Sequence, residues 1–403
     1  MERLLMSHIP KLISSLIIEK IEANGVRLTS RQKKLIQRNI AAERYDIIRI
    51  RDWRWWGPSQ EIHIEFDDAD SARLEQAVRD LTESMTDQFG SIIDEAAEAM
   101  LASVAKDWKR ETLLRECDLQ GFRSRLNTRW HKPLDLLSMM LVLSKEFSEA
   151  TGTRLQNEQT ELNGCLVASL VRLHARACQV GDEILTLLRS GFADGAMARW
   201  RSLYEIAVTA MLIQHGGEQR AERYLLHDAI QVFHGASLHQ RFALRLGEVP
   251  FDESEMGHME RSYNEVKSRF GTAFLCQYGW ASDGPKDMVR GFADVEKKLG
   301  LIHLRPYYKL ASNNVHAKSR GVFHRLGVMH GYDLLLTGPS NFGLADPGQC
   351  MALSLLHVTT ALGSVDPTVE SVIFMKMMQL MCTEISHEFV AVQKQIATDE
   401  FEA

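Results

Sequence analysis

Polar side chains recur at every fourth residue in the segment YYKLASNNVHAKSRG, residues 307–321. In a helix, four residues turn the chain by about 400°, so such side chains lie along one face. Histidine exchanges protons near neutral pH, and an arginine beside it can stabilise the charge that develops on a phosphate. This combination suits attack of an RNA 2′-hydroxyl on the adjacent phosphate without a metal ion. The residues of this stripe are Tyr308, Ser312, His316 and Arg320.

A second candidate pair lies on a helix predicted from residue 196 to residue 214. Arg201 and Glu205 are four residues apart, so they share a face of this helix and can form an ion pair. Such a pair is either purely structural, or it holds Arg201 in one orientation toward an anion. Because the same helix carries apolar residues on another side, we expect Arg201, Glu205 and His316 to converge in one cavity.

Two further segments offer weaker candidates. RLGVMH places four residues between an arginine and a histidine, a spacing that arises often by chance, and gives the alternative catalytic pair Arg325 and His330. A lone histidine on a helix is more often structural than catalytic, which applies to the segment ERYLLHDAI. The candidates for substrate binding are Lys318, His227 and Asp228.

The sequence shows no phosphate-cradling glycine loop, serine-hydrolase motif or zinc motif. Its six cysteines lie far apart without metal-ligand spacing, so we expect no cofactor and no metal. A third interpretation nevertheless stays open, because wide separation in the sequence neither supports nor excludes a metal site. Its ligands would be Glu205, Asp228 and His316.

Composition excludes several classes of protein. Hydrophobic residues make up 45% of the 403 residues, enough to bury sizeable cores. The net charge of −6 gives no global basic field that would recruit nucleic acid, although a local basic cleft remains compatible with it. The longest apolar run near the start, residues 12–18, is too short and too polar to span a bilayer. We therefore expect a cytoplasmic protein that does not bind membranes.

The hydrophobic pattern is helical along most of the chain. We expect a helical N-terminal domain over residues 1–150, with one short extended or β piece at EIHIEFDDAD, residues 61–70. From about residue 155 to residue 398 the pattern is that of an antiparallel helical bundle, with a break at Gly216 and Gly217. Two apolar helices, at about 349–363 and 367–396, close the chain. The expected fold class is therefore all-α.

Four segments, RWRSLYE, RYLLHDAI, YGWA and YYKLASNNVHAKSRG, resemble in this order a bacterial domain-of-unknown-function family numbered five-six-seven-seven. The resemblance covers roughly residues 160–385. That family in turn resembles the HEPN superfamily of helical bundles, which includes metal-independent ribonucleases and defence or toxin effectors. Such nucleases usually place a histidine four to six residues after an arginine, a spacing that Arg325 and His330 fit.

The resemblance implies a HEPN-like effector, namely a metal-independent endoribonuclease in bacterial anti-phage defence or in a toxin system. The alternative is a non-catalytic helical binding or scaffold module that acts through a protein partner. HEPN-like bundles often pair about a two-fold axis, so we also expect a homodimer. The apolar segment SVIFMKMMQLM, residues 371–381, offers a surface for it.

Overall fold

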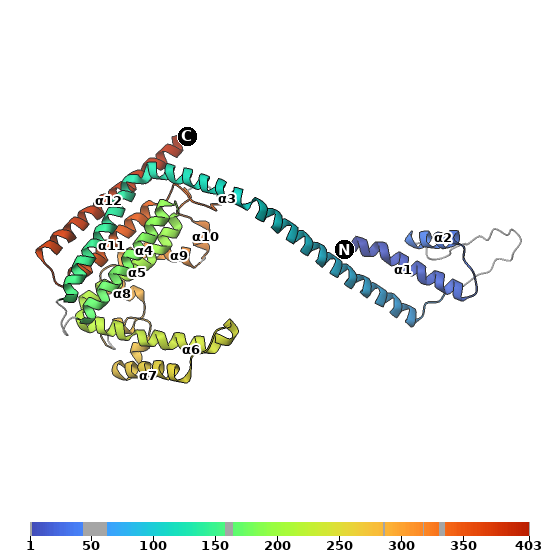
Figure 1. The fold of residues 1–403 in the computed structure, drawn as a ribbon, viewed down its shortest axis with the longest axis horizontal. Helices are drawn as coiled ribbons and strands as arrows, with labels where there is room; N and C mark the ends of the chain where they lie inside the picture. Colours follow the sequence, from blue (N-terminus) through green and yellow to red (C-terminus); the bar gives the residue numbers. More distant parts are fainter. Residues whose placement is uncertain are drawn as a thin grey trace. The chain divides into compact units, whose positions relative to one another are not determined.

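The computed structural model describes residues 2–42, 63–157, 164–284, 287–316, 318–329 and 335–402. These residues form an all-α protein without a strand, as expected for the class (Figure 1). The helices are α1 Glu2–Ala23, α2 Ser30–Ala41, α3 Asp68–Asn157, α4 Gly164–Arg189, α5 Ala193–Leu226, α6 Asp228–Leu246, α7 Glu253–Phe270, α8 Phe292–Lys298, α9 Arg305–Val315, α10 Ser319–Phe323, α11 Ala345–Gly363 and α12 Val369–Glu402. Three 3₁₀ turns, Thr272–Leu275, Gly279–Ala281 and Ile302–Leu304, lie between them.

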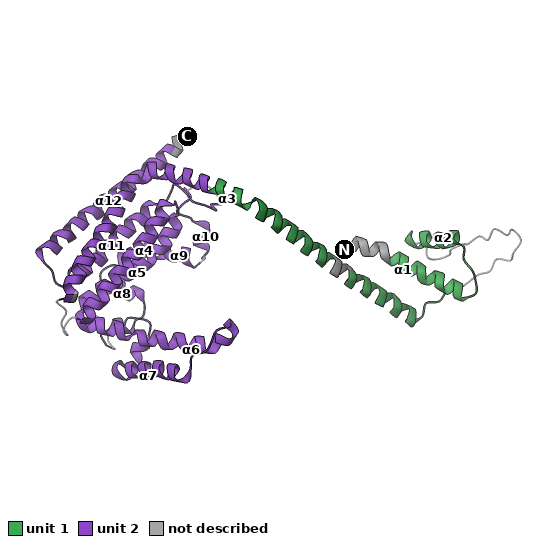
Figure 2. Ribbon diagram, viewed as in Figure 1, with its two compact units in different colours: residues 1–115 green, residues 116–403 purple. Residues whose placement is uncertain are grey.

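The chain divides into two compact units, residues 1–115 and residues 116–403 (Figure 2). The boundary lies within α3, well before the predicted division at residues 150–155. The reason is packing: apolar side chains of the C-terminal part of α3, such as Leu126, Trp130 and Leu137, are buried in the core of the second unit. That part of the helix therefore belongs to the bundle.

The first unit has a small core formed by α1 and α2. Ile18, Ile21, Ile36 and Ile40 are buried together there. The start of α2 is fixed by a capping box, because Thr29 accepts a hydrogen bond from the backbone N–H of Gln32, whose side chain accepts one from the backbone N–H of Thr29 in return. Local side-chain chemistry thus determines where this helix begins.

The extended piece expected at residues 61–70 is not found in the part of this segment that the structure describes. Residues 63–67 have no regular secondary structure, and α3 begins at Asp68. Asp67 and Asp70 each accept a hydrogen bond from the other's backbone N–H, an arrangement that caps a helix. No described segment provides a neighbouring strand for pairing, so the alternating pattern has no sheet in which to bury its apolar face.

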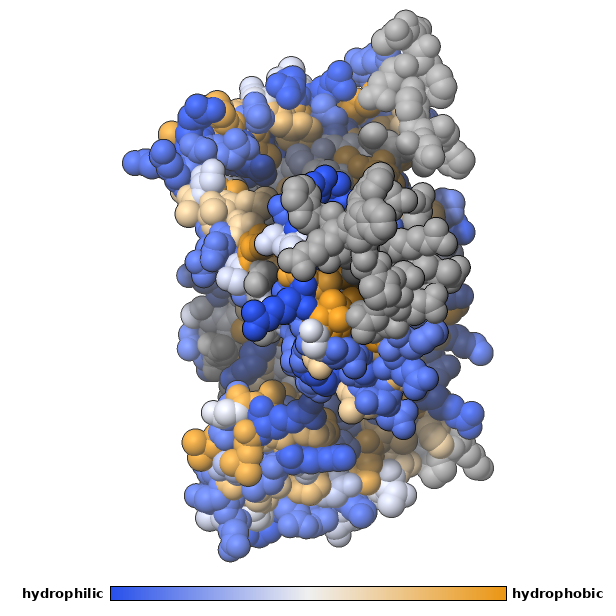
Figure 3. Space-filling model, turned by 90° about the vertical axis from the view of Figure 1, so that its right-hand side faces the viewer, coloured by the Kyte–Doolittle hydropathy of each residue, from blue (hydrophilic) through white to orange (hydrophobic). Residues whose placement is uncertain are grey.

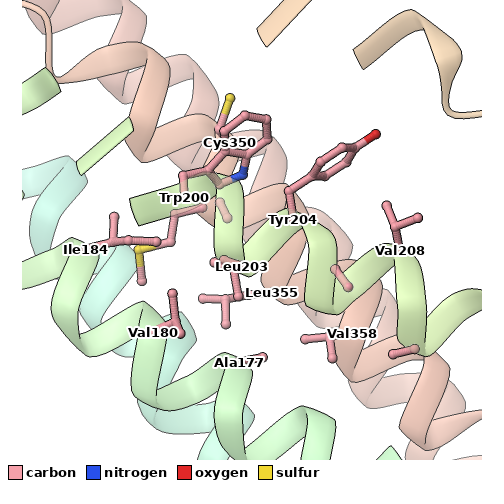
Figure 4. Packing of buried hydrophobic residues seen from close by; sticks show 14 of the residues in the cluster. Ala177, Val180, Ile184, Trp200, Leu203, Tyr204, Val208, Cys350, Leu355 and Val358 are labelled. Atoms are coloured by element: carbon pink, nitrogen blue, oxygen red, sulfur yellow. The ribbon is translucent and has the colours of Figure 1, made fainter. Parts of the chain in front are cut away.

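The second unit is built around α4, α5 and α11, with α12 packed against α11. A stripe of apolar residues on α4 faces this core, where Ala177, Val180 and Ile184 are buried (Figure 4). From α5, Trp200 and Tyr204 project into the same core one turn apart, with their rings stacked at 5.1 Å (Figure 4). Trp200 also donates from Nε1 to Ser354 Oγ of α11 at 2.9 Å, so its buried polar atom has a partner.

The backbone of α5 is interrupted where the sequence predicts a break. Gly217 has φ +62° and ψ −155°, a conformation that side-chain-bearing residues rarely adopt. Before the break, α5 carries Arg201 and Glu205 and contacts α9. The rigid first half of α5 therefore provides the platform on which the candidate site is built.

The helices α6 and α7 pack against each other and leave apolar side chains exposed. Leu244, Leu246 and Val249 lie at the end of α6 and just beyond it, and each is exposed. Figure 3 shows hydrophobic side chains at the surface in its lowest part, where α6 and α7 lie. Among the described helices, none is long and apolar enough to cross a bilayer.

Candidate functional site

Arg201 joins two segments that are more than a hundred residues apart in the sequence. Its Nη2 lies 3.1 Å from Glu205 Oε1 on the same helix, and its Nη1 lies 3.4 Å from His316 Nε2 at the end of α9. A guanidinium only donates hydrogen bonds, so this contact is formed with Nε2 unprotonated and the proton on Nδ1. The predicted proximity of Arg201, Glu205 and His316 is confirmed.

The site is an open surface arrangement. His316 is exposed, whereas the side chain of Arg201 is 24% exposed and that of Glu205 37%. A cavity of about 490 Å³ lies further along α5, lined among others by His215, His357 and Lys376, and it does not include the site residues. Because His316 is exposed, a ligand would approach this imidazole from solvent.

Tyr308 forms a hydrogen bond with the carboxylate of Glu205, which in turn forms an ion pair with Arg201. Its hydroxyl donates to Glu205 Oε1 at 2.5 Å, and burial, followed by the neighbouring Glu205, raises the pKa of Tyr308 to about 12. The phenol therefore stays protonated and acts as a donor at neutral pH. Burial lowers the pKa of Arg201, but the contacts with Tyr308 and Glu205 outweigh it and the net shift is upward.

One polar atom of Arg201 has no partner in the described part of the chain. Its Nε is buried and forms no hydrogen bond, although a buried N–H without a partner is costly. The same guanidinium contributes one terminal nitrogen to Glu205 and the other to His316. A guanidinium beside an exposed imidazole is suited to bind an oxyanion.

A second layer supports the site and was not predicted from the sequence. Glu296 of α8 is fully buried and accepts from Tyr204 Oη at 3.1 Å and from Arg305 Nη1 at 2.5 Å. The guanidinium of Arg305 lies 5.1 Å from the centre of the Tyr308 ring, and that of Arg201 lies 5.0 Å from it. Tyr308 is thus fixed by two cations as well as by its hydrogen bond.

Asp194, at the first turn of α5, is another residue that the sequence analysis missed. Its carboxylate accepts from the backbone N–H of Leu326 at 3.0 Å and of Gly327 at 3.4 Å, and from Arg325 Nε at 3.2 Å. It also accepts from Asn314 Nδ2 at 3.4 Å, next to the end of α9. Asp194 therefore fixes the chain on both sides of α10, and Arg325 is engaged in this structural contact.

The four-residue stripe ends earlier than expected. Helix α9 stops at Val315 with His316 as its C-cap, and a separate short helix, α10, begins after Lys318. Arg320 and Lys318 are exposed on this second element, so Arg320 leaves the stripe. Ser312 Oγ donates to the carbonyl of Tyr308 at 2.8 Å. The hydroxyls of Tyr308 and Ser312 therefore bond to Glu205 and to the Tyr308 carbonyl, and not to the imidazole ring of His316.

The remaining candidates lie elsewhere or outside the described residues. His227 is buried, its Nε2 lies 2.9 Å from the carbonyl of Cys276, and it packs edge-on against Phe274. Asp228 is exposed at the start of α6 and lines a groove between α6 and α7. His330 lies outside the described residues. Within the described ranges no group of three His, Cys, Asp or Glu side chains could hold a metal ion.

Comparison with known families returned one match. Residues 168–332 match the model of a family of unknown function, DUF5677, which confirms the resemblance noted from the sequence over a shorter range. The matched segment runs from α4 to just beyond α10 and contains the four contacting residues Arg201, Glu205, Tyr308 and His316. Neither the curated proteins nor the solved structures gave a match.

Proposed function

We propose that the surface around Arg201 and His316 binds an RNA phosphate and cleaves the adjacent bond as a metal-independent endoribonuclease. The observation that carries this proposal is the 3.4 Å contact between Arg201 Nη1 and Nε2 of the exposed His316. A fixed cation and an unprotonated imidazole are the two groups that attack by a 2′-hydroxyl requires.

The charge of the surrounding chain favours a polyanion. Residues 299–332 contain five Lys or Arg and no Asp or Glu, although the whole chain is acidic. Arg305 and Arg325 are paired with buried or half-buried carboxylates. Lys318 and Arg320 are exposed on α10 and form no ion pair with a described residue, so they are available to follow the phosphate backbone.

The proposed reaction needs only this chain and the RNA. His316 Nε2 takes the proton of the 2′-hydroxyl, and the 2′-oxygen forms a bond to the adjacent phosphorus. Arg201 stabilises the charge of the pentacoordinate phosphorane as the bond to the 5′-oxygen breaks. The imidazolium returns its proton to that leaving oxygen, which gives a 2′,3′-cyclic phosphate and a 5′-hydroxyl. Glu205 and Tyr308 act as positioning residues for Arg201.

The wider proposal includes a HEPN-like bundle for residues 155–398 and a role in bacterial anti-phage defence or a toxin system. It rests on the sequence resemblance together with the bundle of α4, α5, α11 and α12. Its test is growth: induced expression of the parent should reduce colony formation, and His316→Ala should restore it. Equal growth inhibition by both proteins would contradict an effector that acts through this site.

A second candidate function is a non-catalytic module that acts through a protein partner. The exposed apolar side chains of the α6–α7 pair favour it, because solvent-exposed groups such as Leu244 and Val249 gain from being covered. In this alternative the contacts of Glu205 with Arg201 and Tyr308 are a structural network, and RNA is not cleaved.

The decisive experiment measures cleavage and binding of a labelled RNA in the presence of EDTA. We expect the parent to produce 2′,3′-cyclic ends, and His316→Ala to lose about 10²–10⁴-fold in rate while retaining RNA binding. His324→Ala is the matched control, because His324 is also exposed and follows α10. A parent protein that binds RNA without cutting it, also with a partner present, would favour the binding module. Activity lost in His330→Ala but kept in His316→Ala would move the site to the alternative pair.

A further inference from the structure

Residues 91–110 of α3, within the first unit, present the whole circumference of the helix to solvent. Every side chain from residue 91 to residue 110 is exposed. An isolated helix of this kind gains no stability from tertiary packing, which is the main source of helix stability in proteins. It nevertheless carries large apolar side chains, with Met100 70% and Leu101 71% exposed. Such a surface costs free energy unless something covers it.

Six positions define what we call the α3 stripe. They follow one another in steps of four, four, three, four and four residues, which keeps them within about 100° of the helix circumference. The stripe extends over roughly 29 Å of the helix axis. Its members are Phe89, Ile93, Ala97, Met100, Val104 and Trp108.

The α3 stripe is symmetric about a midpoint between residues 98 and 99. Positions at equal distances from this midpoint carry matching apolar residues, and a large residue often corresponds to a small one. In an antiparallel pair of identical helices these positions lie at the same level along the axis, so that each side chain meets a complementary one. Within the stripe the corresponding pairs are Phe89 with Trp108, Ile93 with Val104 and Ala97 with Met100; outside it, the positions of Ile92 and Ala105, and of Ala96 and Leu101, are also both apolar.

Charge distinguishes the antiparallel from the parallel arrangement. Residues 83–98 contain five acidic residues and no basic one, whereas residues 99–115 contain four basic and two acidic ones. Parallel pairing would place acidic half against acidic half. Antiparallel pairing places the acidic half of one helix beside the basic half of the other, for instance Lys106 within one turn of Asp94 on the partner.

We propose that a second copy of this chain covers the α3 stripe as an antiparallel helix pair with a two-fold axis near residues 98 and 99. The occupant is a second copy because both the apolar spacing and the charge distribution complement themselves about one point. A partner of different sequence would not require the apolar spacing or the charge distribution of α3 to be symmetric about one point. This interface lies outside the segment that matches the family model and does not depend on RNA cleavage.

The first test compares the introduction of a glutamate at two positions on opposite faces of α3. Multi-angle light scattering and sedimentation of the full chain should report about twice the monomer mass of 45.8 kDa. Met100→Glu places two charges in the two-fold interface and should weaken dimerisation by about 100-fold. Ala102→Glu, on the opposite face and equally exposed, should change it less than about threefold, since it buries no charge. A monomeric parent at tens of micromolar, or a dimer that survives Met100→Glu, would overturn the proposal; the second result would favour another face such as α12.

The second test measures orientation by disulfide cross-linking. Exposed Cys117 and Cys276 are first replaced by serine, and the other four cysteines are poorly reactive because burial raises the pKa of each thiol. A mixture of Ile93→Cys and Val104→Cys chains should form the mixed disulfide. Ile93→Cys alone should not cross-link, since its two copies would lie roughly 16 Å apart. Efficient self-linking of Ile93→Cys would show a parallel pair and refute the assignment.

Discussion

Acid should destabilise this protein through two histidines, the buried His174 and the half-buried His357, before its carboxylates are protonated. His174 is fully buried, with Nε2 3.0 Å from Thr359 Oγ1 and Nδ1 3.6 Å from Cys178 Sγ. Burial lowers the pKa of His174 from 6.5 to about 4. Burial, with a contribution from His303, lowers that of His357 to about 4 as well.

The sign and size of the effect follow from proton linkage. Between pH 6.5 and pH 4 the unfolded chain binds protons that the folded chain does not, so the free energy of unfolding falls as the pH falls. With 1.36 kcal/mol for each pH unit, each histidine should cost about 2 kcal/mol between pH 7 and pH 5. The two together should cost about 4 kcal/mol, a large share of the stability of a typical domain.

The assay is urea unfolding at pH 7, 6 and 5, followed by circular dichroism and tryptophan fluorescence. His174→Gln removes one titrating group, so its stability should depend on pH by about 2 kcal/mol less than that of the parent over this range. The comparison uses the slope with pH, which stays informative even if the variant is less stable overall. His324→Gln, which replaces an exposed histidine, is the matched control. An unchanged slope in His174→Gln would refute the reasoning.

Three further outcomes follow from packing and hydrogen bonding. Glu296→Ala should lower the free energy of unfolding by roughly 3–5 kcal/mol in urea, because it leaves a guanidinium and a phenol without their buried acceptor. Gly348→Ala should lower the free energy of unfolding by about 1–3 kcal/mol in thermal unfolding, since the new Cβ would lie 2.4 Å from a phenylalanine ring of α12. The control Gly235→Ala, whose Cβ would have nothing within 4 Å, should stabilise α6 by about 0.5–1 kcal/mol. Tyr308→Phe should cost about 1.5 kcal/mol and weaken RNA binding measured by fluorescence anisotropy, because Glu205 loses one of its two partners; unchanged stability would show that water replaces the phenol fully.

Much of the helical architecture was readable from local patterns. The break at Gly217 is confirmed, and like the apolar stripe of α4 and the cap at Thr29 it depends on residues close together in the sequence. The pairing of Arg201 with Glu205 is of the same kind, because a spacing of four residues alone places the two side chains on one face.

The parts that the sequence did not reveal depend on distant contacts. Glu296 lies 92 residues from Tyr204, and Asp194 lies 132 residues from Leu326, so no spacing rule connects them. The sequence offered one sign for Glu296, namely that this charged residue directly follows Val295, an apolar residue that is buried in the structure. The end of α9 at Val315 was not predicted, because the four-residue pattern of polar side chains carries no signal for a helix end.

The carboxylate of Asp194 also has a consequence for motion. Asp194 belongs to the first turn of α5. Its carboxylate accepts hydrogen bonds from the side chain of Asn314 and from the backbone N–H groups of Leu326 and Gly327. Segments that share one acceptor lose their contacts together, so they open as one cooperative unit and not as separate fluctuations. In amide hydrogen exchange, Leu326 and Gly327 should therefore exchange with a common opening free energy. The imidazole of His316, two residues beyond Asn314, would then be held in place or released on that same timescale.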